Sequence, residues 1–219
     1  ARSSSDWLVE YGKGVLANRT RDWANGVKFL QRAVELEPLQ LQPRLELGAA
    51  LLELGEFEAA EEQAVHVLES DPDRILALGQ LASVHAVRAE TNRSTDLVRQ
   101  MTVSIDWSQW QGPQKGGLGA TGACWYDLEL YPGEVALSIN ASGSEVLGVW
   151  PLMIVSLDKE EIGSVSVNRP DVYEFKMRVE RAGNYRLTIY FPNDSTVGQP
   201  GDRNLFVHDA NLQYLSVTR

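Results

Sequence analysis

The pattern of hydrophobic and polar residues changes character near residue 100. Up to about Met101 the chain is rich in Leu, Ala, Glu and Arg at helical spacing. Beyond Trp107 it is rich in Val, Ile, Tyr and Gly, with alternating polarity and frequent turn signals. Such a shift is typical of an α-helical domain followed by a β domain. We therefore predict two separate domains, residues 1–102 and 103–219, with the boundary near residues 102–106.

The helical half contains an internal repeat. Pro38 and Pro72 lie 34 positions apart, and under this offset Gly14 aligns with Gly48 and Trp23 with Phe57. Each of the two prolines follows a helical stretch, and a proline prevents the preceding helix from continuing. A third unit begins at Ile75, but its second helix carries polar residues where packing residues belong: Asn92, Ser94 and Thr95.

The second unit carries the pattern of a known repeat family. Leu47-Gly48 followed by Gly55, Phe57, Ala60, Ala64 and Pro72 resembles the tetratricopeptide (TPR) repeat, for which a 34-residue period is known. The resemblance implies stacked helical hairpins, in which small residues let two antiparallel helices approach closely. It leaves two functions open, because a TPR fold fixes no ligand. The repeats either present a concave surface to a protein or peptide partner, or act as a spacer that positions the second domain.

The second half reads as about eight short strands separated by turn residues. The expected strands are Trp125–Leu130, Glu134–Ala141, Leu152–Leu157, Ile162–Val167, Val172–Val179, Tyr185–Phe191, Leu205–Asp209 and Leu212–Val217. Strands at this spacing, with no helix between them, predict an antiparallel β-sandwich of jelly-roll type. On its strand, Trp125 is expected to belong to the core.

Charge and composition narrow the class of protein. The chain has 30 acidic and 20 basic residues and a formal net charge of -10, so phosphate backbones would repel it and nucleic acid is excluded as a partner. There is no apolar run long enough to span a membrane. The single cysteine, Cys124, allows no internal disulfide and argues against a cysteine zinc site. Acidic oxygens suit hard cations instead.

One long segment between two expected strands does not fit the core pattern. It runs from Phe191 to Leu205, is rich in glycine, and carries Asp194 and Asp202. Two carboxylates together with turn carbonyls suit Ca²⁺, which takes six to eight oxygen ligands in flexible geometry. Taken alone, two aspartates in a turn are usually ordinary turn residues.

This segment also resembles a known family. Asn193-Asp194, a glycine-rich spacer and then Asp202-Arg203-Asn204-Leu205-Phe206-Val207 are similar to the hallmark of calcium-dependent, xylan-binding-type carbohydrate-binding modules. Ala141-Ser142-Gly143 and Trp150-Pro151 resemble the middle of the same family. The resemblance implies a calcium ion with open coordination positions that two neighbouring sugar hydroxyls complete. Asp194 and Asp202 would supply carboxylates to the ion, and Gly201 a carbonyl.

Four further residues are candidates for binding the ligand: Trp150, Asn193, Arg203 and Asn204. Trp150 stands beside a proline after a glycine-containing turn and is the best platform for stacking on a sugar ring. Arg203 and Asn204 are expected to brace the loop rather than touch the metal. The sequence departs from the family pattern at Phe191-Pro192 and His208-Asp209, which bears on the identity of the sugar.

Taken together, these patterns predict a non-catalytic protein that binds a polysaccharide or oligosaccharide through Ca²⁺. No enzyme is expected, because Cys124 has no identifiable histidine partner and no Gly-x-Ser-x-Gly elbow accompanies His208. The alternative is a protein–protein adaptor in which calcium is only structural. Since polysaccharides lie outside the cytosol and free calcium is scarce within it, we expect a periplasmic or extracellular location, and the short repeat array suggests a piece of a larger protein.

Overall fold

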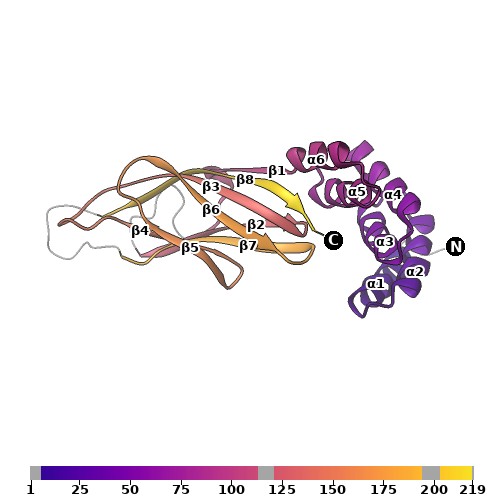
Figure 1. Cartoon of the computed structure of the whole chain (residues 1–219). Helices are drawn as coiled ribbons and strands as arrows, with labels where there is room; N and C mark the ends of the chain where they lie inside the picture. Colours follow the sequence, from indigo (N-terminus) through magenta and orange to yellow (C-terminus); the bar gives the residue numbers. More distant parts are fainter. Residues whose placement is uncertain (1–5, 113–120, 194–202, 219) are drawn as a thin grey trace. The chain divides into compact units, whose positions relative to one another are not determined.

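The computed structural model describes residues 6–112, 121–193 and 203–218 (Figure 1). The chain divides into two compact units, one reaching Met101 and the other running from Thr102 to Thr218. In the described part of the chain, no helix combines the length and the apolar character needed to cross a membrane.

The first unit consists of three helical hairpins. Its helices are α1 (Asp6–Arg19), α2 (Trp23–Leu36), α3 (Leu41–Leu54), α4 (Phe57–Ser70), α5 (Ile75–Val87) and α6 (Thr91–Gln100). Helices α2 and α4 end shortly before Pro38 and Pro72, as proline geometry requires. The prediction of TPR-like helical hairpins is confirmed, including a complete third hairpin.

Small residues set how closely these helices approach. A Cβ atom on Gly14 of α1 would lie 2.4 Å from Cγ of Leu30 on α2. A Cβ on Gly48 of α3 would lie 2.6 Å from Oε1 of Gln80, which belongs to α5. Ala60 and Ala64 on α4 are fully buried. The repeated small residues are therefore packing positions, both within a hairpin and between hairpins.

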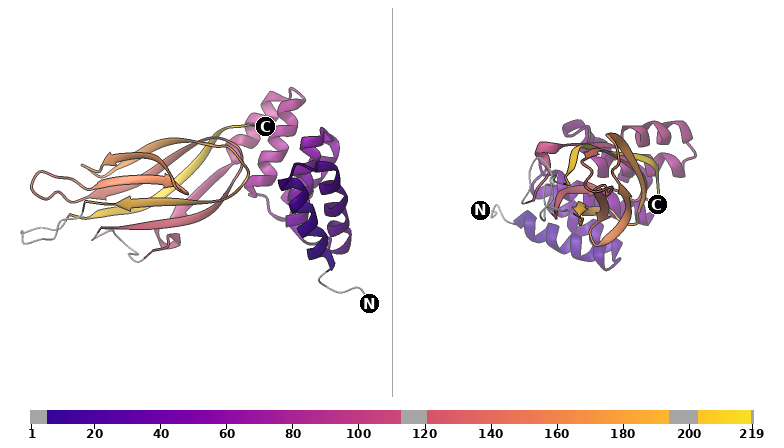
Figure 2. Two further views of the ribbon diagram at one scale, coloured as in Figure 1. Left: turned by 90° about the horizontal axis from the view of Figure 1, so that it is seen from below. Right: turned by 90° about the vertical axis from the view of Figure 1, so that its left-hand side faces the viewer.

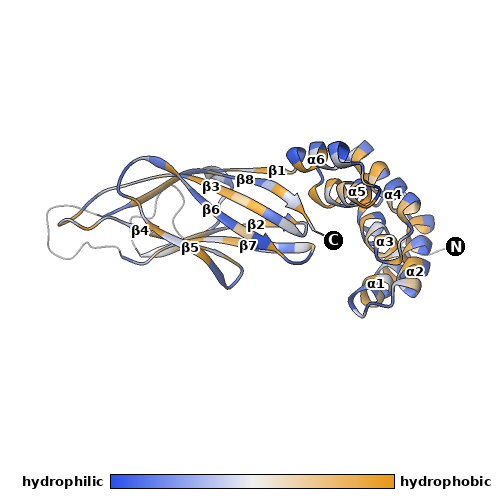
Figure 3. Cartoon of the chain, viewed as in Figure 1, coloured by the Kyte–Doolittle hydropathy of each residue, from blue (hydrophilic) through white to orange (hydrophobic). Residues whose placement is uncertain are grey.

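The third hairpin differs from the first two in its second helix. Most of α5 is buried, whereas Val98 is the buried residue of the shorter α6. Figure 3 shows the contrast, with α6 largely hydrophilic. The polar residues noted in the sequence are therefore compatible with a helix that packs through few side chains.

The second unit is a β-sandwich of two four-stranded antiparallel sheets (Figures 1 and 2). Its elements are β1 (Thr102–Asp106), η1 (Trp107–Gln109), β2 (Gly122–Leu130), β3 (Gly133–Gly143), β4 (Leu152–Leu157), β5 (Glu160–Ser166), β6 (Asp171–Val179), β7 (Gly183–Phe191) and β8 (Leu205–Val217). One sheet has the order β1-β8-β3-β6 and the other β2-β7-β4-β5. The placement of β8 between β1 and β3, and of β7 between β2 and β4, is typical of a jelly roll.

Alternate side chains of each sheet build the core between the two layers. Val135, Leu137 and Ile139 of β3 are fully buried, as are Leu187 and Ile189 of β7. The residues between them point to the opposite faces, because successive side chains of a strand alternate. The sandwich therefore has one shared core and two outward sheet faces.

Three details differ from the sequence prediction. The two last expected strands are one continuous strand, β8. A register shift near Asn140 leaves His208 as an extra residue and interrupts the alternation, which explains why two strands were expected. Residues 102–106, where we expected the boundary, form β1 and pair with β8. Trp125 is half-buried on the outward face of β2 rather than in the core, which holds its neighbour Cys124.

Candidate functional site

A buried arginine joins the two ends of the segment between β7 and β8. The guanidinium of Arg203 donates through Nε to the carbonyl oxygen of Val149 at 3.0 Å and through a terminal nitrogen to that of Val146 at 3.1 Å. Its other terminal nitrogen donates to the carbonyl oxygen of Asn193. Arg203 is only 7% exposed. We call these three bonds the Arg203 clamp; they hold residues 146–149, 193 and 203 together.

The side chain of Asn193 connects the Arg203 clamp to the start of β4. Its Oδ1 accepts a hydrogen bond from the backbone N–H of Leu152 at 2.7 Å, and its Nδ2 donates to the carbonyl oxygen of Trp150 at 3.0 Å. Both ends of the amide therefore bond to backbone. The side chain positions the chain after β7 and fixes the backbone on either side of Pro151.

The backbone of residues 146–149 forms a tight turn. Val146 and Val149 exchange two backbone hydrogen bonds, of 3.0 and 3.1 Å. The two residues between them, Leu147 and Gly148, both have positive φ, of 55° and 77°. Such a pair defines a type I′ turn, which is unusual for leucine because its Cβ crowds the backbone there. The turn presents the exposed Leu147 beside the Arg203 clamp.

Asn204 is held to the chain after β3. Its backbone N–H donates to Oγ of Ser144 at 2.8 Å, and the N–H of Ser144 donates to its carbonyl oxygen at 3.0 Å. Close by, a Cβ on Gly143 would lie 2.3 Å from Cγ of Pro151, so only glycine fits. The structure therefore gathers four of the sequence candidates, Trp150, Asn193, Arg203 and Asn204, around one end of the sandwich.

The three expected metal ligands, Asp194, Gly201 and Asp202, lie outside the described residues. Within the described ranges, no three His, Cys, Asp or Glu side chains come together in a way that could hold a metal ion. The side chains of Asn193 and Arg203 bond to backbone groups. Trp150 is half-buried.

Sequence reasoning missed several contributors to this site. The carbonyl groups of Val146 and Val149 accept from Arg203, and Ser144 pairs with Asn204. The resemblance had marked the neighbouring Gly143 and Pro151, which indicated the region but not these contacts. Backbone carbonyl groups leave no signal in side-chain identity, so no motif could have named them.

Residues 136–215 match the model of a family described as Ca-dependent carbohydrate-binding module, xylan-binding (CBM60). The match includes the Arg203 clamp and the whole segment between β7 and β8. The β unit is therefore similar to carbohydrate-binding modules of this family. The module follows a helical repeat domain in this chain. A comparison with curated proteins found no match.

Solved structures similar to the chain include several TPR proteins. The Arabidopsis OM64 TPR domain is 20% identical with a TM-score of 0.44, and the match covers 45% of this chain and 81% of that one. YrrB, a TPR protein with an unusual peptide-binding site, is 22% identical with a TM-score of 0.42, and covers 43% of this chain, which spans only 49% of YrrB. The TPR2B domain of yeast Sti1 in its complex with pHsp70 is 20% identical with a TM-score of 0.42, and the match covers 43% of this chain and 76% of that one.

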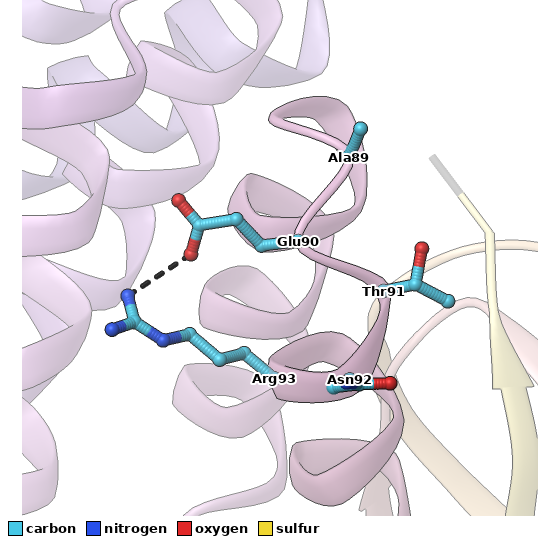
Figure 4. A pocket seen from close by; sticks show the side chains of 5 residues that line it. All are labelled: Ala89, Glu90, Thr91, Asn92 and Arg93. Carbon is cyan, nitrogen blue, oxygen red and sulfur yellow. Dashed lines mark hydrogen bonds and ion pairs between the residues drawn. The ribbon is translucent and has the colours of Figure 1, made fainter.

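Two hollows described in the helical unit bring together no set of side chains typical of a catalytic or metal site. One of about 430 Å³ is lined by the consecutive residues 89–93, and its Arg93 donates to Glu90 at 3.0 Å (Figure 4). Another, of about 370 Å³, lies along one helix, α4, and is lined by Glu58, Glu61, Glu62, Val65, His66 and Glu69. Arg88 bonds to both Glu58 and Glu61. These glutamates form a solvated helix face with a local ion-pair network.

Proposed function

We propose that the module binds a xylan-type polysaccharide through a calcium ion held by the segment between β7 and β8. The observation that carries this proposal is the Arg203 clamp, which ties the two ends of that segment to each other and to residues 146–149. A buried guanidinium with three carbonyl partners is a strong fixed point, because charge-assisted hydrogen bonds are stronger than neutral ones. The family description supports both the sugar class and the metal.

The residues present fit calcium by their chemistry. Asp194 and Asp202 are the chain neighbours of the two clamped residues, Asn193 and Arg203. Carboxylate and carbonyl oxygens are the ligands that Ca²⁺ prefers. Asp194, Asp202 and the carbonyl of Gly201 would hold the ion, and Asn193, Arg203 and Asn204 would brace the loop around it. When bound, the ion offers open coordination positions to neighbouring sugar hydroxyls, and Trp150 would lie beside the sugar.

The remainder of the chain plays a non-catalytic part in this proposal. The helical unit serves as a scaffold or as a surface for a protein or peptide partner. The matching family is described as a binding module and not as an enzyme. This description supports the proposal that the protein is non-catalytic. Since both polysaccharide and millimolar calcium are found outside the cytosol, the protein would work in the periplasm or outside the cell.

Affinity electrophoresis tests the proposal. The whole chain is run through gels containing soluble xylan, with Ca²⁺ and then with EDTA, beside the variants Asp202→Ala and Asp209→Ala. Asp209 is a matched control because it is an exposed carboxylate on β8, bonded to Asn140 and outside the proposed ligand set. We expect xylan to retard the native chain and Asp209→Ala only when Ca²⁺ is present. Asp202→Ala should migrate freely.

Two results would contradict the proposal. Retardation that persists in EDTA would show that binding needs no calcium. Free migration of the native chain in Ca²⁺ would show that the chain does not bind xylan. If the melting temperature still rose with Ca²⁺ in that case, the ion would be structural and the adaptor alternative would stand.

A further inference from the structure

The outward face of the sheet β2-β7-β4-β5 carries aromatic side chains. Tyr190 of β7 is 39% exposed, and Trp125 of β2 is half-buried on the same face. The side chains of alternate parity, among them Cys124 and Ile189, are buried in the core. The aromatic residues therefore lie on the outer surface of the sandwich and are not part of its core.

The strand register places these side chains side by side. Tyr190 pairs with Ala123 on β2 and with Ile154 on β4, and Thr188 pairs with Trp125 and with Ser156. Trp125 and Tyr190 are thus diagonal neighbours, a relation in which Cα atoms lie about 7–8 Å apart. Hydroxyl groups of Thr188 and Ser156 lie in the row of Trp125. The face offers the exposed ring of Tyr190 and, next to it, the indole of Trp125 with the guanidinium of Arg186 over it, with hydroxyl groups beside them.

Polar contacts hold Trp125 in place. Its Nε1 donates to Oε1 of Gln111 at 3.2 Å, and Cζ of Arg186 lies 5.3 Å from its ring centroid. Arg186 in turn donates to both carboxylate oxygens of Asp127, at 2.7 and 2.9 Å. The hydrogen bonds from Arg186 lower the pKa of Asp127, so the pair stays charged. The indole is therefore oriented before any ligand arrives.

The outward face of the other sheet has a different character. There the small polar side chains bond to one another: Ser104 Oγ donates to Asn211 Oδ1 at 3.2 Å, and Asn140 Nδ2 to Asp209 Oδ2 at 2.9 Å. Phe206 is its large exposed aromatic residue among those described, at 38%. It has almost the same exposure as Tyr190, which makes it a matched control.

The aromatic face begins where the proposed calcium loop begins. Tyr190 precedes Asn193 by three residues along the same chain segment. Leu152, whose N–H donates to Asn193, lies two residues before Ile154, the cross-strand partner of Tyr190. The start of the loop, at Asn193, therefore lies next to the end of this face, so a polymer held at the loop is close to Tyr190.

We propose that this outward face is a second sugar subsite, over which a polysaccharide chain bound at the loop continues across Tyr190 toward Trp125. The inference rests on the proposed function and adds to it that the module recognises an extended chain. The C–H face of a pyranose ring is apolar and stacks on an aromatic ring. Thr188 and Ser156 supply hydroxyl groups to the ring's polar edge.

Isothermal titration calorimetry with xylobiose and xylohexaose in Ca²⁺ tests the inference on the whole chain. The quantity compared is the affinity for xylohexaose divided by the affinity for xylobiose, because only the longer ligand can reach the face. In Tyr190→Ala this ratio should fall about tenfold, the effect of losing about one stacking contact. Thr188→Val, which keeps the side-chain shape, should lower the ratio about threefold. Phe206→Ala should keep the native ratio.

The possible results separate this inference from the proposed function. A native chain that binds xylohexaose and shows the same ratio in Tyr190→Ala and Thr188→Val would overturn the second subsite and leave the calcium site standing. An equal fall in Phe206→Ala would also overturn it, because the effect would then not belong to this face. A native chain that binds neither sugar would overturn both. Melting temperatures of all variants confirm that each is folded.

Discussion

At the scale of single residues, Arg203 is the most consequential side chain of the candidate site. It bonds to three carbonyl groups in two stretches of chain that are far apart in sequence. The planar guanidinium can donate to three such acceptors at once. The ammonium group of a lysine, on a flexible stem, lacks this fixed arrangement of donors. Replacing Arg203 therefore takes a charged donor away from each of these carbonyl groups.

We expect Arg203→Lys to lower the free energy of unfolding by about 2–3 kcal/mol, since a hydrogen bond to a charged group contributes about 1.5–3 kcal/mol and lysine cannot keep all three. Urea unfolding measures the change, and xylan affinity in Ca²⁺ should fall with it. The control is Arg178→Lys, whose side chain is 57% exposed in ion pairs with Glu134 and Glu180. That variant should lie within about 0.5 kcal/mol of the native chain. Equal stability of the two variants would contradict the role given to the clamp.

The sequence could predict some of the residues at this site and not others. The motif around Asn193 and Arg203 was visible through a family resemblance, but the contacts of Arg203 were not, because its acceptors are backbone groups. Trp125 is a different case. Its parity is shared by Asp127 and Glu129, and the opposite parity by Leu128 and Leu130, so the alternation already indicated an outward tryptophan.

At the scale of elements, the helix pairs depend on glycine at defined positions. Helix α1 contains two glycines with opposite surroundings. Around Gly12 there is open space within 4 Å of an added Cβ, whereas at Gly14 that atom would meet Leu30. The pair separates the effect of helix propensity from the effect of packing.

We expect Gly12→Ala to raise the free energy of unfolding by about 0.5–1 kcal/mol, because alanine has the higher helix propensity. Gly14→Ala should lower it by about 1–3 kcal/mol, because overpacking against α2 outweighs the same propensity gain. Thermal unfolding followed by circular dichroism at 222 nm measures both. A stabilised Gly14→Ala would show that α1 and α2 are less closely packed than the distance to Leu30 indicates.

The elements themselves were largely predictable, and the exceptions have a physical cause. The 34-residue repeat predicted the helical hairpins, and alternation predicted most strands. Strand β8 was divided in two because His208 and Asp209 are both exposed at the register shift, which resembles the end of a strand. Strand β1 was missed because it is short and its partner, β8, is more than 100 residues away in sequence.

At the scale of the whole molecule, the two units have separate cores. The module includes β1, which pairs with β8 along Thr102–Asp106 and buries Ile105 at 1% exposure. A fragment that begins after this strand would lose a core side chain and expose the edge of β8. The start of the independent folding unit is therefore residue 102 rather than 107.

We expect a fragment of residues 102–219 to bind xylan in Ca²⁺ with an affinity within about twofold of the whole chain. A fragment of residues 107–219 should lose at least about 3 kcal/mol of unfolding free energy, since the loss of a buried isoleucine alone costs about 2–5 kcal/mol. Urea unfolding and affinity gels compare the two. Equal stability would show that β1 is dispensable and that the folding unit begins at residue 107.

The Arg203 clamp also bears on how this module can change. The clamp closes the base of the segment between Asn193 and Arg203, and its three bonds join residues that lie outside the stretch in between. Each doubling of the length of a closed loop costs only about 0.6 kcal/mol. Evolution or an engineer can therefore lengthen, shorten or exchange residues 195–200, which lie between the proposed calcium ligands, at little cost to the sandwich, as antibodies exchange the loops on a constant framework. The module would then acquire new sugar preferences while it keeps one fold.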